Sequence, residues 1–280
     1  MKKIVKSCFM LVLITALCLN VISANALAND KVGNINEEIF EMSGDCGDII
    51  THKPITLDQQ LENVINSEKI NEEQKLKVIA KINSTKEINE EQENRIVTRA
   101  SNTYNCTRSI PYYKQQNSYY CGPATTKQSL QYLKGTSPSQ ATIASSLGTT
   151  TSGTDGTKIV EYLNNNQSSN YYVIVEPTSQ SSMESTIYSG LTNYNAPPIL
   201  RVKITSGQVS TQHPQSWYYT TNGHFMNVSG QYTVNGSTVY QVTDPYIEYK
   251  ASSITSGKYR INSSAVYTST INHFAQHFYY

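Results

Sequence analysis

Residues 110–124 read IPYYKQQNSYYCGPA and are the most informative part of the sequence. Gly-Pro directly after Cys121 marks a turn, and proline is tolerated in the first turn of a helix. The following residues carry Ala124, Leu130 and Leu133 among good helix formers. The pattern predicts a helix over about 121–134, with Cys121 at or just before its first turn.

This position favours a reactive thiolate on Cys121. Unpaired backbone N–H groups and the positive end of the helix dipole converge at a helix N-terminus and stabilise negative charge there. A thiolate is a competent nucleophile near neutral pH, whereas a buried thiol is not. Catalysis also needs an imidazole to protonate the leaving group, and a third group to orient that imidazole.

Among five histidines, His224 fits the imidazole best. Residues 222–230 read NGHFMNVSG, an alternating pattern that predicts a strand. The turn at 234–236, Val-Asn-Gly, and a second strand that leads to Asp244-Pro245 predict a β-hairpin. Such a hairpin can place Asp244 close to His224, although the sequence leaves the register open.

These motifs together resemble the papain-like cysteine peptidases. The resemblance covers roughly residues 105–250 and is closest to the group related to the leader-peptidase domains of bacteriocin-exporting ABC transporters. It implies Cys121 as nucleophile, His224 as general acid/base and Asp244 as the residue that orients the imidazole.

The resemblance also implies Gln115, six residues before Cys121, as an oxyanion-hole donor that acts with the backbone N–H of the cysteine. Gln116 is an adjacent alternative for this role. The transporter members have an Asp immediately before the Cys and carry a membrane domain. Here Tyr120 takes that position and no such domain follows, which argues against double-glycine leaders as the substrate.

Each residue also has a simpler structural interpretation. Cys121 could form a disulfide with Cys106 in an oxidising compartment. His224 could be an ordinary strand residue, and Asp244 could only shape a turn with Pro245. The combination of the motifs favours the catalytic roles.

Composition divides the chain near residue 100. The first hundred residues hold 12 Lys/Arg and 15 Asp/Glu but no Tyr, whereas residues 101–280 hold all 21 Tyr and the one Trp. Charged residues make up 15% of the chain, below the roughly 25% of typical soluble domains, and the formal charge is +1. A nucleic-acid partner is therefore not expected.

The N-terminus predicts export. Residues 1–28 contain three lysines, an apolar run through Ile22, and small-x-small triplets at 24–28, which together describe a cleaved signal peptide. No other stretch of the sequence is long and apolar enough to cross a bilayer. We expect a secreted protein, extracellular or associated with the cell wall.

Residues 29–100 are expected to be a helical propeptide or a linker. Apolar residues recur at helical spacing within 57–99, but aromatic residues are absent, so this segment can hardly build a core alone. In the propeptide interpretation its helices lie on the downstream domain and are later removed. Residues 96–100, IVTRA, are the expected processing site; the alternative is a charged linker.

Removal of the signal peptide leaves three cysteines, Cys46, Cys106 and Cys121. If Cys121 is the nucleophile, Cys46 and Cys106 can pair, which we slightly favour. In the alternative, Cys46 forms a disulfide with Cys121 and keeps a precursor silent.

Residues 101–280 should form an α+β domain of papain-like architecture, with a helical N-terminal half packed on a mostly antiparallel sheet. The expected helices lie near 121–134, 138–147, 155–165 and 181–192; the expected strands include 171–176, 199–204 and a hairpin over 224–244. His273 and His277 have the spacing of metal ligands on a helix, but their aromatic neighbours favour a packed tail. No metal or cofactor is expected.

The leading hypothesis is a secreted cysteine peptidase that acts on a peptide or protein, which could be a cell-wall peptide. A second hypothesis uses the same triad for peptidoglycan amide hydrolysis or acyl transfer. A third is a non-catalytic extracellular binding module. The sequence does not indicate the oligomeric state or the cleavage specificity.

Overall fold

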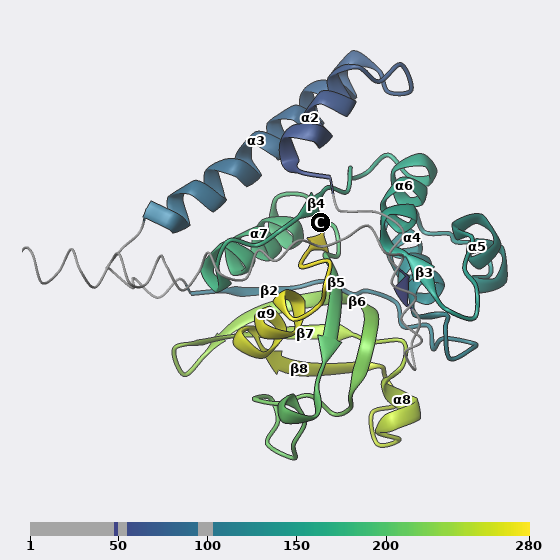
Figure 1. Cartoon of the computed structure of the whole chain (residues 1–280), viewed down its shortest axis with the longest axis vertical. Helices are drawn as coiled ribbons and strands as arrows, with labels where there is room; N and C mark the ends of the chain where they lie inside the picture. Colours follow the sequence, from purple (N-terminus) through teal and green to yellow (C-terminus); the bar gives the residue numbers. More distant parts are fainter. Residues whose placement is uncertain (1–47, 50–54, 95–102) are drawn as a thin grey trace, which may run out of the picture. The chain divides into compact units, whose positions relative to one another are not determined.

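Figure 1 shows the computed structural model, which describes residues 48–49, 55–94 and 103–280. The predicted signal peptide (1–28), Cys46 and the predicted processing site (96–100) lie outside the described residues. The pairing alternatives for Cys46 therefore stay predictions.

The first half of the region 103–280 is helical. Its elements are β2 (Asn105–Thr107), α4 (Cys121–Lys134), α5 (Gln140–Leu147), β3 (Thr154–Asp155) and α6 (Gly156–Asn166). Gly135 and Gly148 end α4 and α5 in the left-handed conformation, with φ of 75° and 65°, which glycine adopts without strain. The three helices predicted here are confirmed to within two residues.

The second half builds an antiparallel sheet with the strand order β4-β9-β5-β6-β7-β8, and β2 pairs with β6. The strands are β4 (Ile174–Val175), β5 (Ile199–Ile204), β6 (Thr221–Val234), β7 (Ser237–Thr243), β8 (Lys258–Asn262) and β9 (Phe278–Tyr279). The strand expected over 171–176 is shorter than predicted, because the Asn164 side chain bonds both the N–H and the C=O of Tyr172.

Helices cover this sheet. In Figure 1, α4, α5 and α6 gather at one side of β5 to β8, and α4 packs on β6. The remaining helices are α7 (Gln180–Thr192), the 3₁₀ turn η1 (Ser206–Gln208), α8 (Ile247–Lys250) and α9 (Ser263–Ile271). Helix α7 packs on β6, and α9 packs on β5 and β7. The predicted α+β architecture, helices followed by a mostly antiparallel sheet, is confirmed.

The predicted hairpin is formed by β6 and β7. Asn235 and Gly236 make the turn with φ of 49° and 75°, the left-handed conformation that a tight two-residue hairpin requires. Tyr232 lies opposite Val239, and the register shifts between Val228 and Gly230, a β-bulge. Beyond the bulge, Asn227 lies opposite Thr243.

The N-terminal part contributes three described elements. Helices α2 (Leu57–Ile65) and α3 (Glu72–Asn94) form a hairpin, and α3 also packs on α7. Strand β1 (Asp48–Ile49) pairs in parallel with β3 and lies close to β6. The helical spacing predicted within 57–99 is therefore confirmed for these residues.

No helix in the described ranges has the length and apolar character that crossing a membrane would need.

Candidate active site

The β6–β7 hairpin brings His224 and Asp244 together. Thr243 ends β7 opposite Asn227, so Asp244 leaves the strand level with Met226, which shares a strand face with His224. The imidazole Nε2 of His224 lies 2.8 Å from Oδ1 of Asp244, and both side chains are fully buried. Two residues separated by twenty positions in sequence thus form a buried hydrogen-bonded pair.

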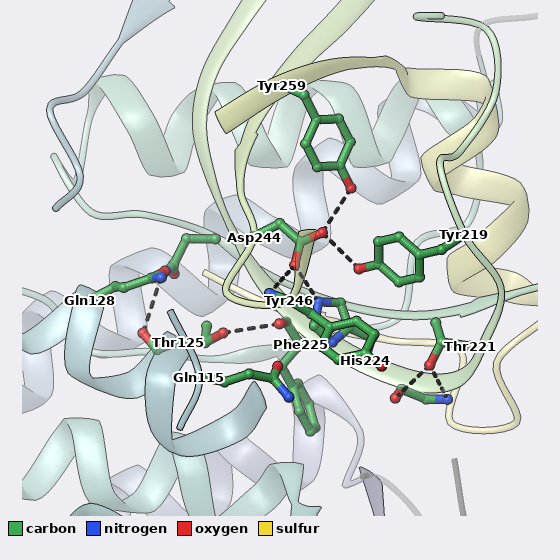
Figure 2. A network of polar contacts seen from close by, with 12 residues as sticks. Gln115, Thr125, Gln128, Tyr219, Thr221, His224, Phe225, Asp244, Tyr246 and Tyr259 are labelled. Atoms are coloured by element: carbon green, nitrogen blue, oxygen red, sulfur yellow. Dashed lines mark hydrogen bonds and ion pairs between the residues drawn. The ribbon is translucent and has the colours of Figure 1, made fainter. Parts of the chain in front are cut away.

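The carboxylate of Asp244 accepts four hydrogen bonds (Figure 2). Oδ1 accepts from His224 Nε2 and from the backbone N–H of Tyr246, both at 2.8 Å. Oδ2 accepts from the hydroxyls of Tyr219 (2.7 Å) and Tyr259 (3.0 Å). Burial alone would raise the pKa of Asp244, but the charge of His224 and these hydrogen bonds outweigh it, so the pKa is lowered from its ordinary value.

An ionised carboxylate can only accept hydrogen bonds, and this fixes the tautomer of His224. Nε2 must carry the proton that it donates to Asp244, which leaves Nδ1 as the nitrogen that can take up a proton. Within the described part of the chain, this Nδ1 is buried and has no hydrogen-bond partner. A buried, unsatisfied nitrogen is costly, so its position marks a place where a polar group is expected.

Aromatic rings enclose the imidazole. Tyr219 meets His224 edge-on with the ring centroids 5.9 Å apart, and Tyr246 lies 6.1 Å away. They shield the His224–Asp244 pair from water, which strengthens its electrostatic interaction. The roles of Tyr219, Tyr246 and Tyr259 were not predicted from the sequence, where the one local signal is the aromatic run 217–219 shortly before His224.

Polar anchors fix α4 against β6. The Thr125 hydroxyl donates to the Phe225 carbonyl at 3.0 Å (Figure 2), and the Ser129 hydroxyl donates to Asn227 Oδ1 at 2.9 Å. Four helical residues advance about 6 Å, and two strand residues advance about the same distance. If the same spacing continues one helical turn earlier, Cys121 is expected level with Gly223, the residue before His224.

Cys121 is the first residue of α4 and is fully buried. Helices α5, α6 and α7 each have a side-chain N-cap, but Tyr120 gives α4 none, and the first turn of α4 holds no acidic residue. The positive end of the helix dipole is therefore not offset by a carboxylate from its own first turn, and it favours negative charge on the Cys121 sulfur.

The glycine after the cysteine is required by packing. A Cβ on Gly122 would lie 2.6 Å from Oγ1 and 2.7 Å from Cβ of Thr154 in β3. Only glycine allows α4 to begin this close to β3, so Gly122 fixes the position from which Cys121 projects.

Cys106 and Cys121 are not joined by a disulfide. Cys106 lies in β2, opposite Gln231 of β6, whereas Cys121 lies at the start of α4. The interpretation in which these two cysteines form a disulfide is therefore wrong.

Gln115 is buried beside the site, and its backbone is tied to the turn after Asp244. Its N–H donates to the Pro245 carbonyl at 2.9 Å, and its own carbonyl accepts from the Tyr249 hydroxyl at 2.8 Å. The side-chain Nε2 donates to the carbonyls of Asn117 (2.8 Å) and Ser118 (3.0 Å). In the described part of the chain, its Oε1 is buried without a partner.

Gln116 differs from its neighbour. Its side chain is exposed, and its backbone N–H donates to Gln140 Oε1 at 3.0 Å. Of the two glutamines, Gln115 is the one that the fold buries against the Asp244 turn.

His273 and His277 are buried near the end of the chain and do not form a pair of metal ligands. His277 Nε2 lies 3.0 Å from both Arg201 and the Tyr279 hydroxyl, and the His273 ring stacks on Phe274. Among the described residues, no group of three or more His, Cys, Asp or Glu side chains could hold a metal ion.

A comparison with protein families finds a match to this chain. The Peptidase_C39 like family matches residues 107–272, more than half of the chain. No curated protein shows significant similarity to the chain. The family match spans the helix of Cys121, the β6–β7 hairpin and the residues enclosing His224.

Two solved structures show a distant likeness. A double-glycine-motif protease from an AMS/PCAT transporter, in complex with the leader peptide, is 16% identical with a TM-score of 0.37, covering 64% of this chain and 96% of its own. Digestive procathepsin L 3 from the larval midgut of Tenebrio molitor is 12% identical with a TM-score of 0.39, covering 81% and 99%. On the family match, the chain belongs to the Peptidase_C39 like family.

Proposed function

We propose that the protein is a secreted cysteine peptidase, made as a precursor, that hydrolyses peptide bonds with Cys121, His224 and Asp244. The observation that carries this proposal is the state of His224. Asp244 holds its Nε2, while Nδ1 is buried without a partner in the described part of the chain. The Thr125 and Ser129 contacts with β6 support a position of the start of α4 near this residue. In this proposal, the Cys121 sulfur becomes the partner of that nitrogen.

The chemistry then follows in two steps. The Cys121 thiolate attacks the carbonyl carbon of the scissile bond, and the imidazolium of His224 gives its Nδ1 proton to the leaving amine, which forms a thioester and releases the first product. His224, now neutral, takes a proton from a water molecule that attacks the thioester. This step releases the acid product and restores the thiolate–imidazolium pair.

Asp244 keeps His224 in the tautomer that these steps require. Its carboxylate stays ionised because four donors converge on it, so Nε2 keeps its proton while Nδ1 exchanges protons. In this proposal Asp244 therefore keeps its charge throughout the cycle.

Gln115 is the proposed oxyanion donor, together with the backbone N–H of Cys121. Its Nε2 donates to two loop carbonyls, so it would exchange one of them for the substrate oxyanion as the tetrahedral intermediate forms. Gln115→Ala should lower kcat about 10²–10³-fold, as is typical for loss of an oxyanion-hole donor.

Strand β1 supports synthesis as a precursor. Asp48–Ile49 pairs with Thr154–Asp155 of β3, and Thr154 packs directly on Gly122, the neighbour of Cys121. Because β1 also lies close to β6, this N-terminal segment runs beside both strands that flank the start of α4. Removal of residues 29–54 should raise the rate of peptide hydrolysis relative to the chain that retains them.

The residues in 1–28 are the basis for proposing secretion. N-terminal sequencing of the protein recovered from culture medium tests it. A first residue at or after position 27 supports export with cleavage, and retention of Met1 inside the cell contradicts it.

A digestion experiment tests the activity itself. Wild-type protein, Cys121→Ala and His224→Ala are incubated with a peptide library and, separately, with purified sacculi. Cleavage of library peptides by the wild type alone supports the peptidase. If the wild type releases wall peptides but cleaves no library peptide, its substrate is peptidoglycan. If Cys121→Ala forms the same products as the wild type, the proposal is wrong.

A further inference from the structure

We propose that the α2–α3 hairpin, residues 57–94, is a permanent part of the folded enzyme, and that it stays bound to residues 103–280 after the chain is cut between them. This inference goes beyond the proposed peptidase activity, because it concerns which parts of the chain form the mature particle. It treats the hairpin separately from β1, the segment that pairs with β3 and lies close to β6.

Gln60 of α2 completes the open edge of the sheet. Its Oε1 accepts from the N–H of Ile174 and its Nε2 donates to the C=O of the same residue, both at 2.8 Å. Val173, the residue before β4, exchanges backbone hydrogen bonds with Tyr280 on the side of the sheet. Because backbone groups alternate along a strand, the N–H and C=O of Ile174 point to the open edge. One side-chain amide therefore takes the place of a neighbouring strand at an edge that would otherwise stay unpaired.

Lys81 of α3 is buried against residues 103–280, with only 2% of its surface exposed. Its ammonium donates to Asn170 Oδ1 (2.8 Å) and to the carbonyls of Tyr171 (3.0 Å) and Tyr280 (2.8 Å). The rings of Tyr194 and Tyr280 each lie 4.2 Å from the same nitrogen. Burial of an ammonium is unfavourable unless acceptors surround it, and here every acceptor comes from the domain and none from the helix itself.

Apolar contacts extend the same interface. Val64, Val78 and Ile82 of the hairpin are buried within the hydrophobic core that continues into the catalytic domain. Thr85, fully buried on the same helix, bonds the Tyr280 hydroxyl. A segment that only covered the domain for a time would not need its charged and polar residues enclosed in this way.

The interface also lies away from the site. Strand β4, which Gln60 caps, is separated from β6 and His224 by β9 and β5. The hairpin therefore does not need to leave for a substrate to reach Cys121. Removal of the hairpin would expose the β4 edge and leave the Tyr171 and Tyr280 carbonyls without their donor.

The test uses the full chain with residues 96–101 replaced by the recognition sequence of a site-specific protease. After cutting, the two fragments are run on size exclusion under native conditions and identified by mass. We expect one species that contains both fragments. Co-elution of the fragments does not depend on turnover, so it tests this inference independently of the proposed peptidase activity.

A pair of matched double variants isolates the hairpin from β1. Gln60→Ala with Lys81→Ala removes the two buried polar anchors, whereas Asn63→Ala with Lys77→Ala alters exposed residues of the same helices. The first pair should raise the apparent dissociation constant of the cut fragments about tenfold or more, since buried carbonyls and an edge strand lose their partners, and the second pair should leave it unchanged.

Separation of the wild-type fragments on cutting, with residues 103–280 keeping their thermal midpoint, would overturn the proposal. Equal retention in the two double variants would also overturn it. If the uncut Gln60→Ala, Lys81→Ala chain fails to fold while the control folds, the hairpin is required by the fold, as proposed.

Discussion

The hydroxyl of Tyr219 donates a 2.7 Å hydrogen bond to Oδ2 of Asp244, the carboxylate oxygen that does not contact His224. Tyr259 donates to the same oxygen at 3.0 Å. The carboxylate is thus held from both sides, which keeps it ionised and keeps Oδ1 directed at the imidazole. Two tyrosines from different parts of the chain act on the site through Asp244.

Tyr219→Phe should lower kcat/KM about tenfold, because a hydrogen bond to a charged group contributes about 1.5–3 kcal/mol, part of which Tyr259 retains. Loss of this donor raises the pKa of Asp244, so the acidic limb of the pH–rate profile should move to higher pH. Tyr267→Phe on α9 is the matched control. If the pH–rate profile of Tyr219→Phe overlays that of the wild type, Tyr219 does not position Asp244 for catalysis.

Asp244→Asn should lower kcat about 10²–10⁴-fold, because an amide can no longer specify the His224 tautomer. It should also flatten the acid dependence of stability. The pKa of Asp244 is lowered from 3.8 in the folded state, so its stabilisation is fully present above that value and is lost as the pH falls through the folded pKa.

Urea unfolding between about pH 2 and pH 6 measures this difference. Asn63→Ala, at an exposed position of α2 that carries no titratable group, should keep the wild-type dependence of the free energy of unfolding on pH. If the free energy of unfolding depends on pH equally in Asp244→Asn and in the wild type, the pKa of Asp244 is not lowered in the folded state.

Thr125→Val should reduce the free energy of unfolding by about 1–3 kcal/mol, because the buried Phe225 carbonyl loses its donor while the side-chain volume is kept. The same change should lower kcat, since this bond fixes the register between α4 and the strand of His224. Thr268→Val, on the exposed face of α9, is the control for stability. If Thr125→Val is destabilised but keeps the wild-type kcat, the Thr125–Phe225 hydrogen bond does not position Cys121 for catalysis.

Gly122→Ala should lower both activity and thermal stability, because its Cβ would overlap the Thr154 side chain. The second variant, Gly122→Ala with Thr154→Gly, removes the atoms that clash and should restore part of the activity. If both variants fold and the double variant recovers no activity, the requirement for Gly122 does not come from its packing on β3.

Local signals explain what the sequence could predict. The boundaries of α4, α5 and α6 depend on nearby caps, turns and the Cys-Gly-Pro step, all of which lie within a few residues of the element they control. The β6–β7 hairpin was also predictable, because Asn235-Gly236 specifies its turn. That turn made an approach of Asp244 to His224 possible, but the register that brings them together could not be predicted from the sequence.

Tertiary contacts explain what the sequence could not predict. Tyr219 and Tyr259 are two of 21 tyrosines, and nothing local distinguishes them until β8 brings Tyr259 beside the end of β7. The pattern of α3 marks Lys81 as one charged residue among many, yet the fold buries it under Tyr280. The β-bulge between Val228 and Gly230, which sets the final register, has no sequence signal that we recognised.

The pH dependence of alkylation at Cys121 tests the central claim most directly. The chain beginning at residue 55 is treated with iodoacetamide, because Cys121 is fully buried and β1 pairs with β3, whose Thr154 lies against the neighbouring Gly122. Labelled peptides are quantified with Cys106 as an internal reference. We predict a reactive thiol at Cys121 with a pKa below the roughly 8.5 of free cysteine, which rises in His224→Ala. A Cys121 that titrates near 8.5 and is unchanged by His224→Ala would contradict the thiolate–imidazole pair.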